Sequence, residues 1–236
     1  MKLQKETRRT DWPDKKRYDD ACAAAHAMDL FGERWAMPVM RELLLGPRRF
    51  SGLKTSLNGI SAKMLTERLE GLEAAGILVK KKLPPPASVQ VYELTRWGYE
   101  AAPIFQAMGR WAVRSPRHDP GRPFSPVSLM LSLRTMFSAD AAGDWAGRLQ
   151  LRMHNEDYFW IRDQGEIAIG RGAIERPDVL LTGTPPAIAS IVYGNRPLDD
   201  AIGAGDLAVE GDRSLIERLP ACFPMPEKTS APERPS

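Results

Sequence analysis

Three consecutive lysines, Lys80, Lys81 and Lys82, form a group whose side chains could bind phosphates. Ammonium groups this close together neutralise neighbouring phosphates of a nucleic acid and release their counterions. A solvated edge strand is the alternative interpretation, because lysines at a sheet edge discourage aggregation. A helix with short polar residues and one lysine precedes the run, so we favour phosphate binding.

The net charge of the chain is divided unevenly along its length. The 236 residues carry a formal net charge of +3 at pH 7, with residues 1–118 at +8 and residues 119–236 at −5. A basic part joined to an acidic part indicates that only the first part meets a polyanion. The composition, 43% hydrophobic and 27% charged, is that of a globular protein and excludes wholesale disorder.

Other side chains that could hold metals or catalyse reactions lack the necessary spacing. His26, His118 and His154 stand alone, without the spacing of metal ligands. The glycine-spaced segment 165–172 lacks the strand-to-helix context of a phosphate loop. No nucleophile motif or paired-carboxylate motif occurs. We therefore expect no metal, no cofactor and no catalytic residue, and we predict that the chain is not an enzyme.

Two cysteines, Cys22 and Cys222, are too few for a disulfide framework. Cys22 stands in the first turn of a predicted helix, and a helix N-terminus lowers the pKa of a thiol. Asp19 and Asp20 adjoin it and would raise that pKa. Cys22 is thus a candidate for oxidant sensing, although we favour an inert buried thiol.

Hydrophobic periodicity and capping residues predict helices and one hairpin in the first half of the chain. Ser61 caps a strong helix that Gly76 ends, and Ile60 and Leu65 form a hydrophobic staple across its start. Helices followed by a two-stranded hairpin and a last helix are typical of a winged helix-turn-helix domain, here over residues 21–115. The predicted helices cover residues 21–31, 35–45, 50–57, 61–75 and 95–115, and the strands cover residues 77–82 and 89–94.

The helix over residues 61–75 has an apolar face and a polar face. Leu65, Leu69 and Leu72 recur at i, i+4 and i+7 and are expected to pack on the preceding helices. The N-terminal part of the polar face fits a major groove. Arg68 lies toward the buried side, so a structural ion pair is as good an interpretation as a DNA contact. The predicted DNA-binding residues are Arg48, Arg49, Ser61, Ala62, Lys63, Thr66, Glu67, Lys80, Lys81 and Lys82.

Several co-linear segments within residues 20–115 form a recognisable series: 30–35 (LFGERW), 41–50 (RELLLGPRRF), 59–69 (GISAKMLTERL), 72–77 (LEAAGI) and 92–95 (YELT). They resemble the HxlR family of bacterial winged-helix transcriptional regulators. The chain departs from that family at Pro38, where an aliphatic residue is usual, and at Ala23, where a proline often follows the cysteine. The resemblance implies a homodimer that binds a double-stranded DNA operator and pairs through terminal helices. It also aligns Cys22 with a cysteine that some relatives use to sense oxidants.

The helix predicted over residues 95–115 carries a stripe suited to such pairing. Its apolar residues recur at intervals of four and three, the rhythm of a helix–helix contact. An intramolecular core is the alternative, but so thin a domain has little core for this many aromatic side chains. Pro103 interrupts the stripe and is expected to kink the helix. The predicted dimer interface consists of Trp97, Ala101, Ile104, Met108 and Trp111.

Proline-rich and charged segments mark the remaining boundaries. We predict a charged flexible tail over residues 1–20, a proline-rich linker over 116–126 and a flexible tail over 224–236. Between the last two, periodicity predicts helices over residues 126–137 and 185–193 and strands over 148–153, 158–162, 166–170 and 178–182.

Residues 127–223 contain a second set of recognisable motifs. Asp178-Val179-x-Leu181, Gly194 and the segment 205–212 (GDLAVEGD) resemble the sterol-carrier-protein-like lipid-binding domain. That resemblance implies a five-stranded sheet and helices around an apolar tunnel. The predicted fold class is therefore α+β, with an N-terminal winged helix-turn-helix domain and a C-terminal α+β sterol-carrier-like domain.

A tunnel of this kind would bind acyl chains, sterols or flat aromatic molecules. Alternation along the strands and the stripe of the first helix predict which side chains face it. Trp160 and Phe159 are large enough to fill the space instead, which would leave a structural or dimerising domain. The predicted lining residues are Leu129, Leu133, Met136, Trp160, Leu181 and Ile188.

The leading hypothesis is a dimeric, sequence-specific DNA-binding transcriptional regulator, modulated by a hydrophobic small molecule in its second domain. One alternative is a lipid-binding or carrier protein whose winged helix mediates protein contacts. The other is a thiol-based redox-sensing regulator. No segment is apolar enough to span a bilayer and the charged start is no secretory signal, so we expect a cytoplasmic protein without a membrane partner.

Overall fold

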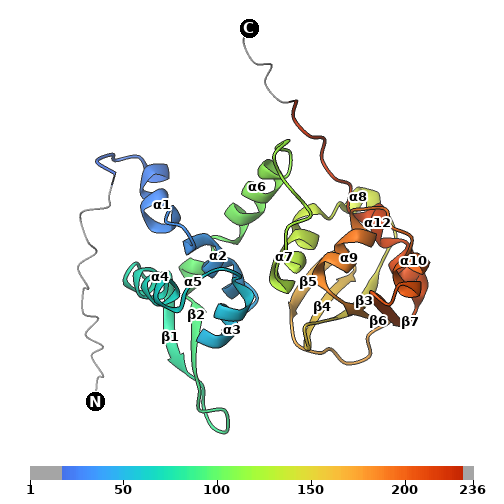
Figure 1. Cartoon of the computed structure of the whole chain (residues 1–236), viewed down its shortest axis with the longest axis horizontal. Helices are drawn as coiled ribbons and strands as arrows, with labels where there is room; N and C mark the ends of the chain where they lie inside the picture. Colours follow the sequence, from blue (N-terminus) through green and yellow to red (C-terminus); the bar gives the residue numbers. More distant parts are fainter. Residues whose placement is uncertain (1–17, 231–236) are drawn as a thin grey trace. The chain divides into compact units, whose positions relative to one another are not determined.

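The chain forms two compact units, residues 1–101 (unit 1) and residues 102–236 (unit 2). The computed structural model describes residues 18–230, which Figure 1 draws in colour. Most of the predicted charged tail, residues 1–17, and the end of the predicted C-terminal tail, residues 231–236, lie outside the described residues. Between residues 18 and 230, no helix has the length and apolar character needed to cross a membrane.

Unit 1 has the predicted order of helices and hairpin (Figure 1). The hydroxyl of Ser61 accepts a hydrogen bond from the backbone N–H of Met64 at 3.1 Å and so caps the fourth helix, as predicted. Pro38 lies in the first turn of the second helix, where its missing N–H leaves no carbonyl without a partner. The elements are α1 (Ala23–Phe31), α2 (Ala36–Leu43), α3 (Phe50–Ser56), α4 (Ala62–Ala74), β1 (Leu78–Lys82), β2 (Gln90–Leu94) and α5 (Arg96–Tyr99).

The apolar face of α4 lies in the core of unit 1. Leu65, Leu69 and Leu72 are each at most 2% exposed, which confirms the predicted face. Helix α4 packs on α2, whose Val39 and Met40 are also buried. Because buried apolar area stabilises by about 25 cal/mol per Å², this packing fixes one side of α4 and leaves its polar side outside.

The predicted single helix over residues 95–115 is wrong. The structure has α5, which ends at Tyr99, and a separate α6 (Ala102–Ala112). Pro103 is the physical reason, because it has no N–H to donate to the Tyr99 carbonyl and its ring would collide with that carbonyl. The boundary between the units falls at the same break, so α6 belongs to unit 2 and not to the predicted first domain.

Unit 2 is built on a five-stranded sheet, the strand number that the second resemblance implies. Its strand order is β5-β4-β3-β6-β7; β3 and β6 run parallel, and the other neighbouring pairs are antiparallel. The strands are β3 (Gly147–Met153), β4 (Glu156–Asp163), β5 (Glu166–Arg171), β6 (Val179–Gly183) and β7 (Leu207–Gly211). After α6, the helices are α7 (Pro126–Met136), α8 (Ala139–Ala142), α9 (Pro185–Val192), α10 (Leu198–Gly203), α11 (Arg213–Glu217) and α12 (Leu219–Cys222).

One face of this sheet contributes to the core of unit 2. Leu149, Leu151, Tyr158 and Trp160 share a face by strand alternation, and each is at most 2% exposed. Helix α7 packs on β5 and α11 packs on β6. The hydroxyl of Ser125 caps α7 by accepting the backbone N–H of Ser128 at 3.1 Å.

Candidate nucleic-acid interface

The N-terminal part of α4 presents small side chains and a single charge. Ser61, Ala62, Lys63 and Thr66 are all exposed, as predicted. The leucines of this helix recur with its 3.6-residue period and stay on the buried face, so the polar residues are left outside. A helix with such short side chains can enter a major groove and hydrogen-bond to base edges.

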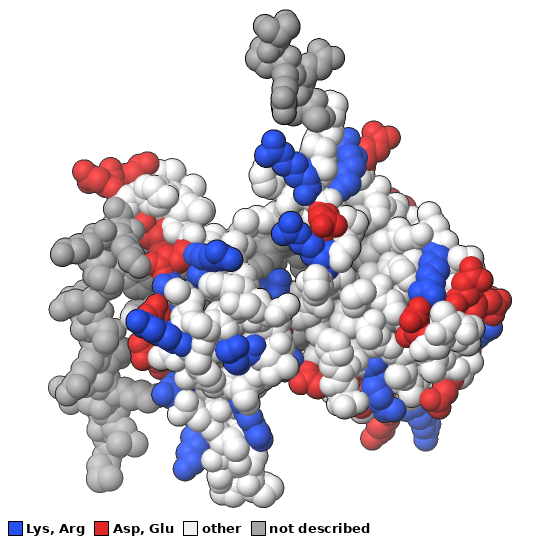
Figure 2. Space-filling model, in the orientation of Figure 1, with Lys and Arg blue, Asp and Glu red and all other residues white. Residues whose placement is uncertain are grey.

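The three lysines of the β1–β2 hairpin, which we call the wing, differ in their surroundings. Successive side chains along β1 point to opposite faces, so Lys81 points away from the face that Lys80 and Lys82 share. The ammonium of Lys81 forms an ion pair with the carboxylate of Glu93 at 2.6 Å across the hairpin. The ammonium groups of Lys80 and Lys82 are exposed and form no ion pair with an acidic residue in the range 18–230. Figure 2 shows basic side chains on both sides of the hairpin, next to an uncharged tip.

Arg48 is only 7% exposed, so its side chain offers little surface to a phosphate, and its predicted phosphate contact stays a prediction. Its backbone N–H donates to the carbonyl of Tyr92 at 2.9 Å, and the N–H of Tyr92 donates to the carbonyl of Arg48 at 2.8 Å. This bridge ties the segment before α3 to β2 and holds the Arg48 side chain inward, against Gly52. Arg49 is exposed, and its contact with a phosphate stays a prediction.

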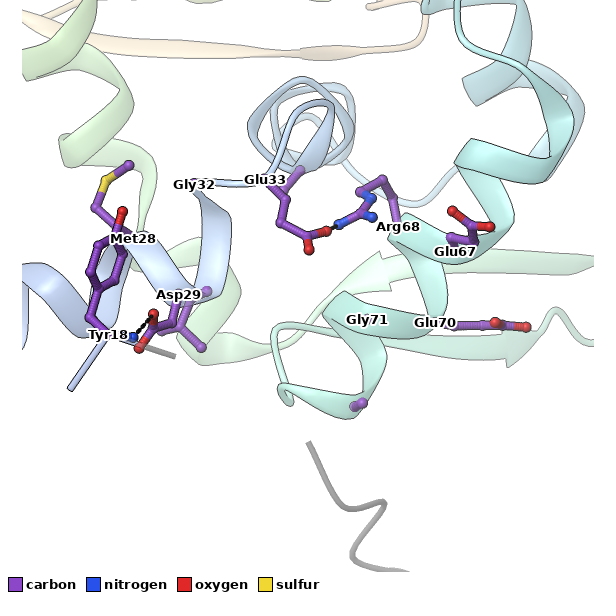
Figure 3. Close-up of a pocket in the computed structure, with 12 residues that line it drawn as sticks. Tyr18, Met28, Asp29, Gly32, Glu33, Glu67, Arg68, Glu70 and Gly71 are labelled. Carbon is purple, nitrogen blue, oxygen red and sulfur yellow. Dashed lines mark hydrogen bonds and ion pairs between the residues drawn. The ribbon is translucent and has the colours of Figure 1, made fainter. Parts of the chain in front are cut away.

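A groove of about 500 Å³ lies between α1 and α4 (Figure 3). Figure 3 shows Arg68 of α4 directed at Glu33, with which it forms an ion pair. Of the two interpretations of Arg68, the structure thus favours the structural ion pair. Glu67 and Glu70 line the same groove, so this flank of α4 is acidic and repels phosphates. The contact of Glu67 with DNA stays a prediction.

Two acidic residues that position these cations, Glu93 and Glu33, were not singled out from the sequence. Strand alternation would have placed Glu93 on the face of Lys81 once the hairpin register was known. The approach of Glu33 to Arg68 depends on how the end of α1 meets α4, for which the sequence carries no local signal.

The predicted dimer interface is largely exposed. Trp97, Ile104, Met108 and Trp111 are 50%, 44%, 40% and 76% exposed, and Ala101 is partly exposed. These values disagree with the alternative that the stripe is an intramolecular core. Helix α6 has no buried residue between Ala102 and Ala112. The stripe thus presents large apolar side chains to the surroundings of the protein.

The Cys22 thiol is exposed, so the favoured interpretation of a buried thiol is wrong. Cys22 is the N-cap residue of α1, where the backbone N–H groups of Ala25 and Ala24 lower the pKa of the thiol by stabilising the thiolate. Asp20, which was expected to raise this pKa, directs its carboxylate to the backbone N–H of Cys22 at 2.9 Å. Cys222 is buried, and burial raises the pKa of its thiol.

The predicted lining residues of the second domain lie mostly in its core. Met136 is partly exposed, and the others are at most 4% exposed: Leu129, Leu133, Trp160, Leu181 and Ile188. Aromatic rings surround Trp160, with the ring centroids of Trp145, Phe137 and Phe223 at 5.3, 5.4 and 6.0 Å. Phe159 does not join them, because it points to the opposite face of β4 and its ring covers Gly170.

Buried polar atoms in the described part of unit 2 include side-chain donors without an acceptor, and one of them lies at the centre of this aromatic cluster. The indole Nε1 of Trp160 is buried and has no hydrogen-bond partner among the described residues. The neighbouring Trp145 differs, since its Nε1 donates to the carbonyl of Leu215 at 3.1 Å. In the described range 18–230, no group of three or more His, Cys, Asp or Glu side chains could hold a metal ion.

Comparison with known proteins covers the first part of the chain. The family model of HxlR-like helix-turn-helix proteins matches residues 30–119. YvaP of Bacillus subtilis, described as an uncharacterized HTH-type transcriptional regulator, is 37% identical over 87 residues, which are 36% of this chain and 80% of that protein. The HTH-type transcriptional regulator YodB of the same organism is 37% identical over 86 residues, which are 36% of this chain and 77% of that protein.

Solved structures are also similar to part of the chain. The reduced form of YodB from B. subtilis is 34% identical, covers 44% of this chain and 100% of its own, and gives a TM-score of 0.38. Quinone-bound YodB is 34% identical to this chain. The match covers 38% of this chain and 93% of the YodB chain and gives a TM-score of 0.34. The redox regulator HypR in its reduced form is 26% identical to this chain. The match covers 39% of this chain and 90% of the HypR chain and gives a TM-score of 0.36.

Proposed function

The chain belongs to the HxlR-like helix-turn-helix family through residues 30–119, and from this premise we propose how it acts as a transcriptional regulator. It binds a double-stranded operator with the N-terminal part of α4 in the major groove. The wing lies along the adjoining backbone, where Lys80, Lys82 and Arg49 neutralise phosphates. The observation that carries this proposal is the exposed first part of α4, free of acidic side chains up to Thr66.

This arrangement separates specificity from affinity. Lys63 and Thr66 on α4 read base edges, and such contacts distinguish one sequence from another. The wing cations contact phosphates, which position the protein on the duplex without reading its sequence. The acidic flank of α4 at Glu67 and Glu70 limits how much of the helix lies against the phosphates.

Two copies of the chain pair through the exposed apolar residues of α6 in this proposal. Trp111, at 76% exposed, is the largest apolar side chain that pairing would cover. Burying it against a second copy removes apolar area from water, which is the main favourable term in association. A two-fold dimer reads an inverted repeat whose half-site centres lie about 10 bp apart or a multiple of that distance.

A gel-shift experiment with DNA from upstream of the gene tests the proposal. We expect a discrete complex that unlabelled operator removes and unrelated DNA of equal length does not. Footprinting should then show two related half-sites. A lipid-binding or carrier protein whose winged helix only contacts proteins would give no specific complex, and that result would exclude the regulator mechanism proposed here.

A hydrophobic small molecule with a hydrogen-bond acceptor modulates DNA binding from unit 2 in this proposal. The sterol-carrier-like resemblance suggests the class of ligand, and the unpartnered Nε1 of Trp160 supports the acceptor. A buried donor without an acceptor costs about 1–3 kcal/mol, which a ligand oxygen would offset. Because rings surround Trp160, the ligand must displace one of them, and Phe223 follows the last helix rather than belonging to the sheet.

Oleate and an anilinonaphthalene sulfonate dye, titrated into the full chain, test this effector site. We expect binding at one molecule per chain, weakened by Trp160→Phe, which keeps the ring and removes the N–H. Trp145→Phe is the matched control, because the Trp145 N–H already has a partner. The ligand must also change operator affinity, which requires unequal binding to two conformations. If neither probe binds, the effector site is rejected and DNA binding is unaffected.

A second candidate function, thiol-based sensing, is favoured by the exposed Cys22 thiol with its lowered pKa. Among the relatives, HypR is described as a redox regulator and YodB has been crystallised with bound quinone. By this proposal the Cys22 thiolate adds to a ring carbon of a quinone, the ring takes up a proton and becomes a hydroquinone thioether, and the modified protein releases the operator. Release that persists in Cys22→Ser would contradict it, and Cys222→Ser is the matched control.

A further inference from the structure

Helix α6, which belongs to unit 2, has two faces with different surroundings. With 3.6 residues per turn, Ile104, Met108 and Trp111 project to one side of the helix. Gly109 projects to the opposite side, and Val113 follows on that side one residue beyond the end of the helix. The first three side chains are 40–76% exposed, whereas Val113 is 7% exposed. One face is therefore open, and the other is covered.

The covered side of α6 packs on α7. The guanidinium Nε of Arg110 donates to the backbone carbonyl of Thr135 at 2.8 Å, near the C-terminal end of α7. At Gly109, a Cβ atom would lie 3.7 Å from the side chain of Thr135, so the two helices meet closely at this point. The hydroxyl of Thr135 donates to the carbonyl of Leu131 at 2.6 Å and is held within α7.

The C-terminal segment adds a second connection, which we call the strap (residues 227–229). The backbone N–H of Thr229 donates to the carbonyl of Arg114 at 2.8 Å, and the ammonium of Lys228 donates to the carbonyl of Ser115 at 3.2 Å. In return, Nε of Arg114 donates to the carbonyl of Glu227 at 3.3 Å. Part of the segment predicted as a flexible tail thus joins the chain just beyond α6.

We propose that α6 couples unit 2 to the dimer: its docking on α7 and the strap orders the helix whose open face pairs with a second copy. This inference rests on the proposed dimer interface. Helix α6 has 11 residues, and isolated helices of this length are marginal in water. Docking supplies the order that pairing needs, so docking and pairing must strengthen each other by the same factor.

This coupling gives unit 2 a route to the DNA. A change in α7, such as one caused by a ligand in unit 2, alters the order or position of α6 and with it the pairing of the two copies. A dimer carries two α4 helices on one molecule and can hold both halves of an inverted repeat, whereas a separated chain holds only one half-site and binds the operator more weakly. No ligand has to approach the wing or α4 for this to work.

Sedimentation equilibrium of the full chain tests the coupling without an effector. The variant Arg110→Ala/Thr229→Pro removes the bond to α7 and the backbone donor of the strap, and neither residue lies on the open face. We expect its dimer dissociation constant to rise at least about fivefold, the lower bound that the loss of two net hydrogen bonds implies. Arg122→Ala is the matched control, because that arginine is exposed and its ion pair with Asp119 lies in the linker; it should leave the constant unchanged.

Trp111→Glu separates failure of the coupling from failure of the interface. A monomeric wild type, or a dimer that Trp111→Glu does not dissociate, rejects the interface and the coupling together. A dimer that Trp111→Glu dissociates, but that Arg110→Ala/Thr229→Pro leaves within twofold of the wild type, rejects the coupling alone.

Hydrogen exchange gives an independent readout if the double variant does not fold. By reciprocity, the monomeric Trp111→Glu should exchange the backbone amides of α7 faster than the dimeric wild type. Equal exchange of α7 in the two proteins would overturn the coupling.

Discussion

Lysines at neighbouring positions of β1 differ in what they can bind, because a strand directs successive side chains to opposite faces. Lys81 shares its face with Glu93 and already forms an ion pair, with the two side chains 56% and 27% exposed. Such a pair at the surface is weak, at about 0–1 kcal/mol, yet a phosphate must still compete with the carboxylate. Lys82 meets no such competition within the described residues.

Lys82→Ala is therefore expected to weaken binding to every DNA sequence and to reduce the salt dependence of log K by about 0.9. Lys81→Ala should have a smaller effect on both quantities, because Glu93 already neutralises much of its charge. Fluorescence anisotropy at several NaCl concentrations measures both. Equal effects of the two variants would show that the ion pair with Glu93 does not limit phosphate binding by Lys81. An unchanged salt dependence in both variants would contradict the proposed contact between the wing and the phosphates.

Cys22 carries the pH prediction. Its thiol has a lowered pKa, so the reactive thiolate exists at lower pH than for an ordinary cysteine, whose pKa is about 8.5. The alkylation rate with iodoacetamide should rise with pH through a midpoint below that value. Cys222→Ser should keep this fast reaction and Cys22→Ser should abolish it, because the Cys222 thiol is buried with a raised pKa. A midpoint no lower than that of an unstructured cysteine peptide under the same conditions would contradict the role of the backbone N–H groups.

At the scale of single elements, α4 combines a capped start with the surface that is proposed to recognise DNA. The Ser61 hydroxyl caps the helix, and the same residue is exposed on the surface proposed to meet DNA. Helix α4 is held by its buried leucines, whereas α6 depends on its partners. This difference explains why α4 can present side chains rigidly and why α6 is suited to coupling.

Substitutions at Ser61 separate these two roles. Ser61→Ala removes the cap and should lower the free energy of unfolding by about 1 kcal/mol, measured by urea denaturation. Ser61→Asp keeps a capping oxygen and should keep most of the stability, but its negative charge should weaken operator binding. If Ser61→Asp bound the operator as tightly as the wild type, α4 would not begin near the phosphates.

At the scale of the whole molecule, the chain has two cores. Leu69 is 1% exposed in unit 1 and Leu151 is 1% exposed in unit 2, and the two belong to different compact units. A protein with two cores does not unfold as one cooperative unit unless the interface between them is strong. The division also matches the charge, because the basic part of the sequence lies mainly in unit 1 and the acidic part in unit 2.

Calorimetry should therefore show two unfolding transitions. Leu69→Ala should lower the midpoint of one and Leu151→Ala that of the other, each at a cost of about 2–5 kcal/mol to its own unit. Leu69→Ala should also weaken operator binding, since it loosens α4. A single transition that both substitutions shift equally would show that the two units unfold together.

Local signals were sufficient wherever an element depends on its own residues. The Ser61 cap, the leucine period of α4 and the first-turn position of Pro38 were predictable because they act within a few residues of the chain. Strands β3 to β6 of unit 2 were predictable from alternation for the same reason, whereas β7 was not predicted as a strand. Pro103 predicted an interruption of the helix, but the sequence indicated only a kink where the structure has two separate helices, α5 and α6.

Contacts between residues distant in the sequence decided which cations are exposed and unpaired and which unit contains α6. The bridge of Arg48 to Tyr92 buried a predicted phosphate contact, and Glu93 paired with one of three apparently equal lysines. The assignment of α6 to unit 2 likewise depends on Arg110 meeting Thr135 and on the strap. Sequence alone determined the family, the position and polar face of α4, and the basic first part. Which cations are free, and which unit holds α6, depended on tertiary packing, because pairing energies arise only once the chain brings distant side chains together.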